Sequence, residues 1–293
     1  MIVLDVQGGL GNQLFNYAIG RKISIVMNTK LKLDISRYNK YFRPYQLDKF
    51  NINEEIADEK EISRIRDGVG IKGINKIVFK IRRRFLPYYL KPYLVDKNCY
   101  YDKKVLKCWD NSYLSGLWQT EKYFQDIRDL LLKEITVKED LDAFNLDVIK
   151  KMQSVNSVSV HIRRGDYITC EKDANNIGSV SSEYYENAIN YFLEKYSDIV
   201  FYVFSDEIAW VKDNMNLPEN TIFLNHNQIN NKDYLDLILI SKCKFHIIAN
   251  STFSWWGAWL STNPDKEVIA PKKWWKSVSL NDINVVPDSW MKI

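Results

Sequence analysis

Hydrophobic residues in the second half of the chain fall into two alternating patterns. Short continuous apolar runs are typical of buried parallel strands, whereas apolar positions that recur every three or four residues are typical of helices. The runs predict strands at residues 157–162, 200–204, 221–224, 244–249 and 267–270, the last of the chain. The helical spacing predicts helices at residues 182–196, 207–215, 234–241 and 253–260. This alternation predicts a doubly wound parallel sheet from about residue 154 onward.

The N-terminal end predicts a β-α-β unit of its own. An apolar run at residues 2–6 is followed by a glycine-rich loop, by apolar residues at helical spacing, and by a second strand at residues 30–34. Residues 35–110 have only short apolar periods and predict mixed helices and loops, and two further helices are predicted at residues 121–134 and 141–152. We therefore expect an α/β protein with two domains, residues 1–153 and 154–293, and a cleft between them.

Composition narrows the class of protein without naming it. The 293 residues are enough for two domains, and the net charge of +4 is too balanced to indicate a nucleic-acid partner. The four cysteines form no C-x-x-C pair and have no histidines at zinc-ligand spacing, so we expect neither a metal site nor a disulfide framework. The sequence shows no signal-peptide pattern and no apolar run long enough to span a bilayer. The expected location is cytoplasmic, or at most peripheral to the inner face of the membrane.

In open parallel sheets, ligands bind beyond the carboxyl ends of the strands, and four segments place polar residues there. The first is the loop at residues 7–13, where Gly9 and Gly11 allow close backbone approach and the next helix offers N–H groups to a diphosphate. A purely structural turn is the alternative. A nicotinamide dehydrogenase would also use Gly-x-Gly and an acid such as Asp34, but its third glycine would fall at Leu14.

The second segment, residues 158–167, ends a strand with two adjacent arginines. Arg163 and Arg164 are costly to place near a core unless an anion pairs with them, and arginine suits bidentate phosphate recognition. It also suits a leaving diphosphate on which negative charge develops. An ion pair with a nearby acid such as Asp166 is the alternative. His161 alone is more typical of a hydrogen-bonding residue than of a base.

The third and fourth segments follow the strands at residues 200–204 and 244–249. Asp206 is equally suited to ligand contact and to capping the next helix. Ser251, Thr252 and Ser254 begin a helix, where they are expected either to cap it or to grip a phosphate. The tryptophans that follow fall within an apolar helix and are expected to fill the core.

Together, these segments resemble glycosyltransferase family 11, the α-1,2-fucosyltransferases, in the motifs GGLGNQLFNYAIGR, HIRRGDY, FSDE and NSTFSWWGAW. The motifs span residues 6–260. The resemblance implies a GT-B-like fold with two Rossmann-like domains that face across a cleft, with GDP-fucose in the C-terminal domain and the acceptor on the N-terminal side. It implies inverting transfer of L-fucose from GDP-β-L-fucose to the 2-hydroxyl of a galactoside in a glycan, giving an α-1,2 linkage. No cofactor or metal is implied, and the only Asp-x-Asp pair, Asp140 and Asp142, lies at a predicted helix start.

The resemblance also implies roles for individual residues. Arg163 grips the leaving phosphate and forms a catalytic group with Asn12 and Asp166, although the general base is not assigned. The residues implied to contact the substrates are Gly9, Gly11, Gln13, His161, Arg164, Asp206, Ser251, Thr252 and Ser254.

Other readings of the sequence stay open at this point. A non-catalytic carbohydrate-binding module would use the nine tryptophans, and a nicotinamide-dependent dehydrogenase is a further alternative. Residues 76–91 are basic and aromatic without an acid. They predict peripheral contact with an anionic membrane, which suits a galactose-containing oligosaccharide or lipid-linked glycan as acceptor. A solvated charged helix is the alternative.

Overall fold

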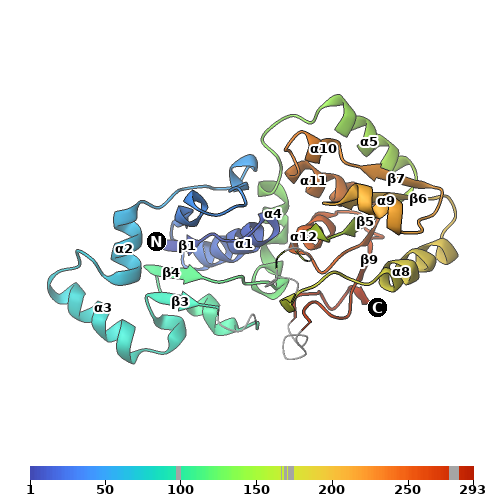
Figure 1. Ribbon diagram of the computed structural model, residues 1–293. Helices are drawn as coiled ribbons and strands as arrows, with labels where there is room; N and C mark the ends of the chain where they lie inside the picture. Colours follow the sequence, from blue (N-terminus) through green and yellow to red (C-terminus); the bar gives the residue numbers. More distant parts are fainter. Residues whose placement is uncertain (97–99, 166, 168–169, 171–174, 277–283) are drawn as a thin grey trace. The chain divides into compact units, whose positions relative to one another are not determined.

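The chain forms two compact units, residues Met1–Lys138 and Glu139–Ile293. The computed structural model describes residues 1–96, 100–165, 167, 170, 175–276 and 284–293 (Figure 1). The division falls earlier along the chain than the expected boundary after residue 153. Helix α5 (Ala143–Ser154) belongs to the second unit because it packs on α11 (Tyr234–Lys242) and on the strand that follows it. No helix within the described ranges is long and apolar enough to cross a bilayer.

The first unit contains a four-stranded parallel sheet with the order β2-β1-β4-β3. Its strands are β1 (Ile2–Asp5), β2 (Leu31–Asp34), β3 (Tyr93–Val95) and β4 (Ser112–Ser115). Its helices are α1 (Leu10–Val26), α2 (Glu59–Asp67), α3 (Gly73–Phe85) and α4 (Arg128–Glu134). The N-terminal β-α-β prediction is confirmed, since β1 pairs in parallel with β2 and α1 connects them.

Two predictions for this unit were wrong. Strand β3 lies in the stretch predicted to hold only helices and loops, because three residues that alternate between exposed and buried are too short to show a period. The helix predicted at residues 121–134 is instead two 3₁₀ turns, Glu121–Tyr123 and Gln125–Ile127, followed by α4. Thr120 caps the first turn with its hydroxyl, which accepts from the backbone N–H of Lys122 at 3.4 Å.

The second unit contains a six-stranded, fully parallel sheet with the order β10-β9-β8-β5-β6-β7. Its strands are β5 (Asn156–Ile162), β6 (Ile199–Ser205), β7 (Thr221–Leu224), β8 (Phe245–Ile247), β9 (Glu267–Ala270) and β10 (Met291–Lys292). Its other helices are α8 (Ser182–Lys195), α9 (Ile208–Asn214), α10 (His226–Ile229) and α12 (Thr252–Leu260). The doubly wound sheet is confirmed, and the two parallel sheets give the chain the expected α/β fold of GT-B type with Rossmann-like units. Strand β9 is not the last, because the two-residue strand β10 pairs with it.

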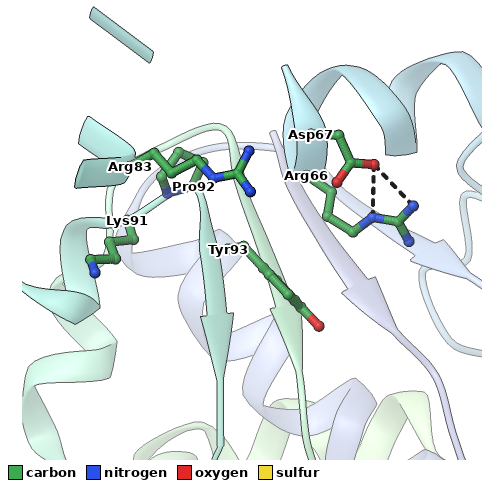
Figure 2. A pocket seen from close by; sticks show the side chains of 6 residues that line it. All are labelled: Arg66, Asp67, Arg83, Lys91, Pro92 and Tyr93. Carbon is green, nitrogen blue, oxygen red and sulfur yellow. Dashed lines mark hydrogen bonds and ion pairs between the residues drawn. The ribbon is translucent and has the colours of Figure 1, made fainter. Parts of the chain in front are cut away.

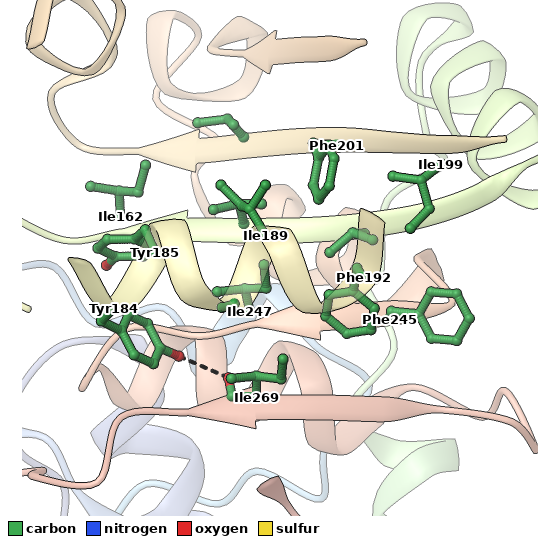
Figure 3. Close-up of a cluster of buried hydrophobic side chains, with 14 of the residues drawn as sticks. Ile162, Tyr184, Tyr185, Ile189, Phe192, Ile199, Phe201, Phe245, Ile247 and Ile269 are labelled. Carbon is green, nitrogen blue, oxygen red and sulfur yellow. Dashed lines mark hydrogen bonds between the residues drawn. The ribbon is translucent and has the colours of Figure 1, made fainter. Parts of the chain in front are cut away.

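The apolar runs of the strands account for the core of the second unit. Side chains of β5, β8 and β9 pack against the inner face of α8 (Figure 3). Tyr184 on α8 joins the layers by donating its hydroxyl to the carbonyls of Ile248 and Ile269, at 2.7 and 3.0 Å. Trp255 and Trp256 on α12 are fully buried, which confirms that these tryptophans fill the core.

A buried carboxyl on α11 is expected to make stability depend on pH. Asp236 is 2% exposed and accepts from the amide of Asn227 at 2.8 Å, and burial raises its pKa to about 7. At pH below its unfolded pKa of about 4, both states hold this proton and the contribution to stability is complete. As pH rises toward 7, only the unfolded chain releases the proton, so stability falls.

The change Asp236→Asn is expected to remove this dependence, because an amide of the same shape does not titrate. Between about pH 5 and about pH 8, the wild-type free energy of unfolding should fall by about 3 kcal/mol more than that of the variant. Urea unfolding at the two pH values measures the difference. The same change in unfolding free energy between the two pH values in both proteins would show that Asp236 is not the responsible group.

Candidate active site

The carboxyl ends of the parallel strands in the second unit meet at one edge of the sheet. Arg163 and Arg164 follow β5, Asp206 follows β6, and Asn250 to Thr252 follow β8. Since β5 pairs with both β6 and β8, three of the four sequence-predicted segments lie at neighbouring strand ends. This is the edge at which open α/β sheets bind ligands.

Arg163 and Asp206 form an ion pair at this edge. One guanidinium nitrogen of Arg163 lies 3.0 Å from Oδ2 of Asp206, and the two side chains are 23% and 22% exposed. The other carboxylate oxygen accepts from the backbone N–H of Arg164 at 3.0 Å. Gly165 allows this close approach, because a Cβ there would lie 2.6 Å from the carboxylate. Asp206 therefore orients Arg163, and a guanidinium has five N–H groups, so this pair is compatible with a second anion.

The side chain of Arg164 has partners different from those of Arg163. Its Nε lies 3.2 Å from a carboxylate oxygen of Glu207, and its guanidinium stacks 3.2 Å from the ring centre of Trp210. Planar stacking and one ion pair fix this side chain in place. The side chain of Arg164 is therefore held by Glu207 and Trp210, whereas that of Arg163 pairs with Asp206.

His161 is buried at the end of β5, and its ring lies tilted against that of Phe253, with ring centres 5.6 Å apart. Burial, helped by the positive charge of Arg163, lowers its pKa to about 3, so the imidazole is neutral at physiological pH. Its Nδ1 is buried without a hydrogen-bond partner in the described part of the chain. A buried polar atom of this kind is costly unless a ligand or water satisfies it.

The polar residues at the start of α12 were expected either to cap the helix or to bind a phosphate. Ser251 is the N-cap residue, yet its hydroxyl makes no capping hydrogen bond, and Thr252 is the first residue of the helix. Ser254 is buried and donates to the carbonyl of Ser251 at 3.3 Å. The first N–H groups of a helix need partners and favour an anion, so this helix start remains suited to a phosphate. Capping by Asp206 is not observed either, because Glu207 is the N-cap residue of α9.

A pocket of about 350 Å³ lies beside Asn250 at the ends of β8 and β9. The amide nitrogen of Asn250 donates to the carbonyl of Gly178 at 2.9 Å, while its oxygen is buried without a partner among the described residues. The pocket is also lined by three lysines that the sequence analysis missed: Lys272, Lys273 and Lys276. The signal for the first two was available, because two cations follow the apolar strand β9 after a single proline, Pro271. Three cations beside a strand end suit an anionic ligand.

In the first unit, the glycine-rich loop lies between β1 and α1. Gly8 has a φ of +80°, which favours glycine. Gly9 is the N-cap residue, and the side chain of Arg43 occupies the space where its Cβ would be. Asn12 accepts from the side chain of Gln119 at 2.8 Å, and Gly11 is buried in the first turn of α1.

Gln13 is tied up inside this loop. It is fully buried, and its amide donates to the carbonyls of Gly8 and Pro44, at 3.1 and 2.9 Å, while accepting from the N–H of Gln46 at 2.9 Å. All of these bonds hold backbone in place. Gln13 therefore shapes the loop, and we expect it to act on a ligand only through the backbone of its neighbours.

The sequence analysis did not predict the buried hydrogen-bond network of Asp5 and Asp34 at the ends of β1 and β2. Asp5 at the end of β1 is 2% exposed and forms a bidentate ion pair with Arg37, at 2.6 and 2.7 Å. Asp34 at the end of β2 accepts from the hydroxyl of Tyr113 at 2.7 Å. Because Asp34 is satisfied inside the protein, it does not present a free carboxylate to a ribose, as a dinucleotide site would require.

Two sequence expectations concern metals and the general base. Asp142 accepts from the N–H of Asn145 at 2.8 Å as the cap of α5, so the Asp-x-Asp pair is a helix start, as expected. Within the described ranges, no group of three or more His, Cys, Asp and Glu side chains is arranged to hold a metal ion. Metal independence stays a prediction. Asp166 lies outside the described residues.

Comparison with known proteins places the chain in a family. The sequence pattern of Glycosyl transferase family 11 matches residues 1–293. An alpha-1,2-colitosyltransferase of Escherichia coli is 36% identical, over 100% of this chain and 99% of that protein. The O-antigen biosynthesis glycosyltransferase WbnK of Escherichia coli is 33% identical, over 98% and 99%. A galactoside alpha-(1,2)-fucosyltransferase 2 of Rattus norvegicus is 30% identical over 47% of this chain and 41% of that protein.

The fold has a solved counterpart. The NodZ alpha-1,6-fucosyltransferase soaked with GDP-fucose matches with a TM-score of 0.53, covering 88% of this chain and 91% of that chain. The two sequences are only 13% identical, so this likeness supports the fold alone.

Proposed function

This chain belongs to glycosyltransferase family 11, and we propose that it transfers L-fucose from GDP-β-L-fucose to the 2-hydroxyl of a galactoside in a glycan, with inversion to an α-1,2 linkage. Membership of a family of glycosyltransferases sets aside two earlier alternatives, the non-catalytic carbohydrate-binding module and the nicotinamide-dependent dehydrogenase. The observation that carries the proposal is the position of Arg163, oriented by Asp206 at the ligand-binding edge of a parallel sheet.

The expected chemistry needs little more than positioning and charge. The acceptor hydroxyl oxygen forms a bond to C1 of fucose as the bond from C1 to the GDP oxygen breaks, and the bonding electrons leave with GDP. The hydroxyl proton is released to solvent through a general base that is not assigned. Negative charge therefore develops on the diphosphate, and a preformed guanidinium lowers the energy of that state. Arg163 supplies the guanidinium. The start of α12 and the lysine pocket would hold the remaining phosphate oxygens.

The neutral His161 has a different role in this proposal. With a pKa of about 3 it carries no charge to stabilise the diphosphate at physiological pH. Its unpartnered Nδ1 is suited to a hydrogen bond with the donor nucleotide, which would satisfy a buried polar atom. Asn12 and the loop at residues 7–13 are proposed to act on the fucose side of the donor.

A second donor is favoured by one observation. The relative that matches over the full length at 36% identity is named for colitose, which is fucose without its 3-hydroxyl. A site that hydrogen-bonds the 3-hydroxyl of fucose rejects colitose strongly. An apolar site at that position accepts colitose and rejects fucose only weakly. GDP-colitose is therefore the alternative donor for the same reaction.

Release of GDP from each donor, measured against a panel of galactose-terminated oligosaccharides, tests the proposal. We expect GDP release that requires both GDP-fucose and a terminal galactose with a free 2-hydroxyl. Acceptors in which this hydroxyl is removed should be inert. Turnover with GDP-colitose but not with GDP-fucose would replace the donor while keeping the site, and turnover with neither would overturn the proposal.

A further inference from the structure

Helix α3 has an apolar face that the rest of the first unit leaves uncovered. Residues spaced three, four and seven positions apart share one side of a helix. The side chains on this face are between 47% and 73% exposed: Ile74, Ile77, Val78, Ile81 and Phe85. A helix usually turns such a face toward a core, and a contiguous exposed apolar patch marks an interaction surface.

A different side of α3, which carries Phe79 and Arg82, attaches the helix to its unit and fixes its rotation. The ring of Phe79 packs on Gly68, where a Cβ would lie 2.5 Å from the ring. Arg82 is only 8% exposed, and its guanidinium donates to the carbonyls of Leu90 and Asp110, at 2.6 and 3.0 Å. These contacts keep the apolar face turned to solvent.

Arg82 therefore attaches α3 to its unit, and a test of the basic stretch at residues 76–91 must leave Arg82 in place. A triple substitution of the three consecutive arginines would damage the attachment of α3 as well as its surface charge. Arg83 and Arg84, by contrast, are exposed.

The charge around the apolar face has a single sign. The sequence contains no acidic residue between Asp67 and Asp96. At 100° per residue, Arg84 and Lys80 fall on one flank of the apolar face, whereas Lys76 and Arg83 fall on the far side of the helix. An apolar face flanked by cations is the pattern of helices that lie in the surface of an anionic membrane.

A pocket of about 470 Å³ continues this positive surface beside α3. Figure 2 shows its lining residues, which come from the end of α2, from α3 and from the start of β3: Arg66, Asp67, Arg83, Lys91, Pro92 and Tyr93. Arg66 is paired with Asp67 at 3.0 Å, which leaves the pocket with a net positive lining. These cations add to the positive charge of this part of the first unit, which favours an anionic partner.

We propose that the apolar face of α3, with the cations Lys80 and Arg84 on its flank, binds a membrane that contains anionic lipids. The apolar side chains enter the interface between headgroups and acyl chains, and the cations contact lipid phosphates. A second copy of the chain fits less well, because two surfaces of the same charge repel each other. The inference does not depend on the proposed transfer reaction, since none of its residues belongs to the candidate active site.

Sedimentation with vesicles tests the proposal. We expect the wild-type protein to bind phosphatidylcholine vesicles that contain phosphatidylglycerol, and to bind pure phosphatidylcholine vesicles far more weakly. Lys80→Ala combined with Arg84→Ala should weaken binding about 30-fold, because each cation near the surface contributes a factor of roughly five. Ile77→Ser combined with Phe85→Ser should weaken it at least as much.

The matched control is Lys103→Ala combined with Lys104→Ala, which removes the same charge from two exposed positions in the same unit. It should bind like the wild type, and thermal unfolding should confirm that all variants are folded. Wild-type protein that stays in the supernatant with anionic vesicles would overturn the proposal. So would a dimer in sedimentation velocity that is lost in the Ile77 and Phe85 variant while vesicle binding is unchanged.

Discussion

Replacing Arg163 with lysine is expected to lower turnover by at least about two orders of magnitude. Lysine keeps the charge but loses the planar fork that can contact Asp206 and a phosphate at the same time. Asp206 lies 3.0 Å from the Arg163 guanidinium and sets its direction. A lysine has a single nitrogen, so it cannot hydrogen-bond Asp206 and a phosphate in the same geometry. Steady-state rates of GDP release at saturating donor and acceptor measure this loss.

Arg164→Lys provides the matched control, because the same substitution is made one residue along the chain. The side chain of Arg164 is held by Glu207 and by stacking on Trp210, and not by the carboxylate that pairs with Arg163. We expect its turnover to fall by less than about tenfold, since a partly exposed ion pair and a stacking contact contribute modestly. Similar losses in both variants would mean that the two arginines act as a structural pair rather than in distinct roles.

Replacing Arg82 with alanine is expected to have the largest effect on stability, lowering the free energy of unfolding by about 3 kcal/mol. The buried guanidinium donates to the carbonyls of Leu90, Asp110 and Asn111 and, at 2.7 Å, to the hydroxyl of Ser112. Its removal leaves several buried acceptors unpaired and opens space against the ring of Trp109.

Urea unfolding of Arg82→Ala and Arg84→Ala measures the contrast between two arginines of the same helix. Arg84 is exposed, and its replacement should change stability by no more than about 0.5 kcal/mol. A loss below about 1 kcal/mol in the Arg82 variant would show that the loops at residues 90 and 109–112 hold together without it. The distinction matters because only Arg84 belongs to the proposed membrane-binding surface.

The regular part of the fold was predictable from the sequence for a physical reason. Strands such as β5 and β6 are buried on both faces, so their continuous apolar runs stand out against the helical spacing of α8. Strands β3 and β10 have three and two residues and little burial, so no period could reveal them. Their pairing depends on neighbouring strands that are distant in sequence.

The candidate site was predictable only as far as strand ends could be located. Placing Arg163 and Asp206 after adjacent strands brought them to one edge, but their ion pair depends on the close approach that Gly165 allows. The sequence also did not separate the three consecutive arginines of α3. Helical rotation puts Arg82 on the attached side, yet which side is attached depends on the packing of Phe79 on Gly68.

A crystal structure of the protein with GDP would test the central claim most directly. The account predicts a diphosphate at the carboxyl edge of the six-stranded sheet, within hydrogen-bonding distance of Arg163 and of the start of α12. Nucleotide bound elsewhere would contradict it, as would Arg163 still paired with Asp206 but turned away from bound nucleotide.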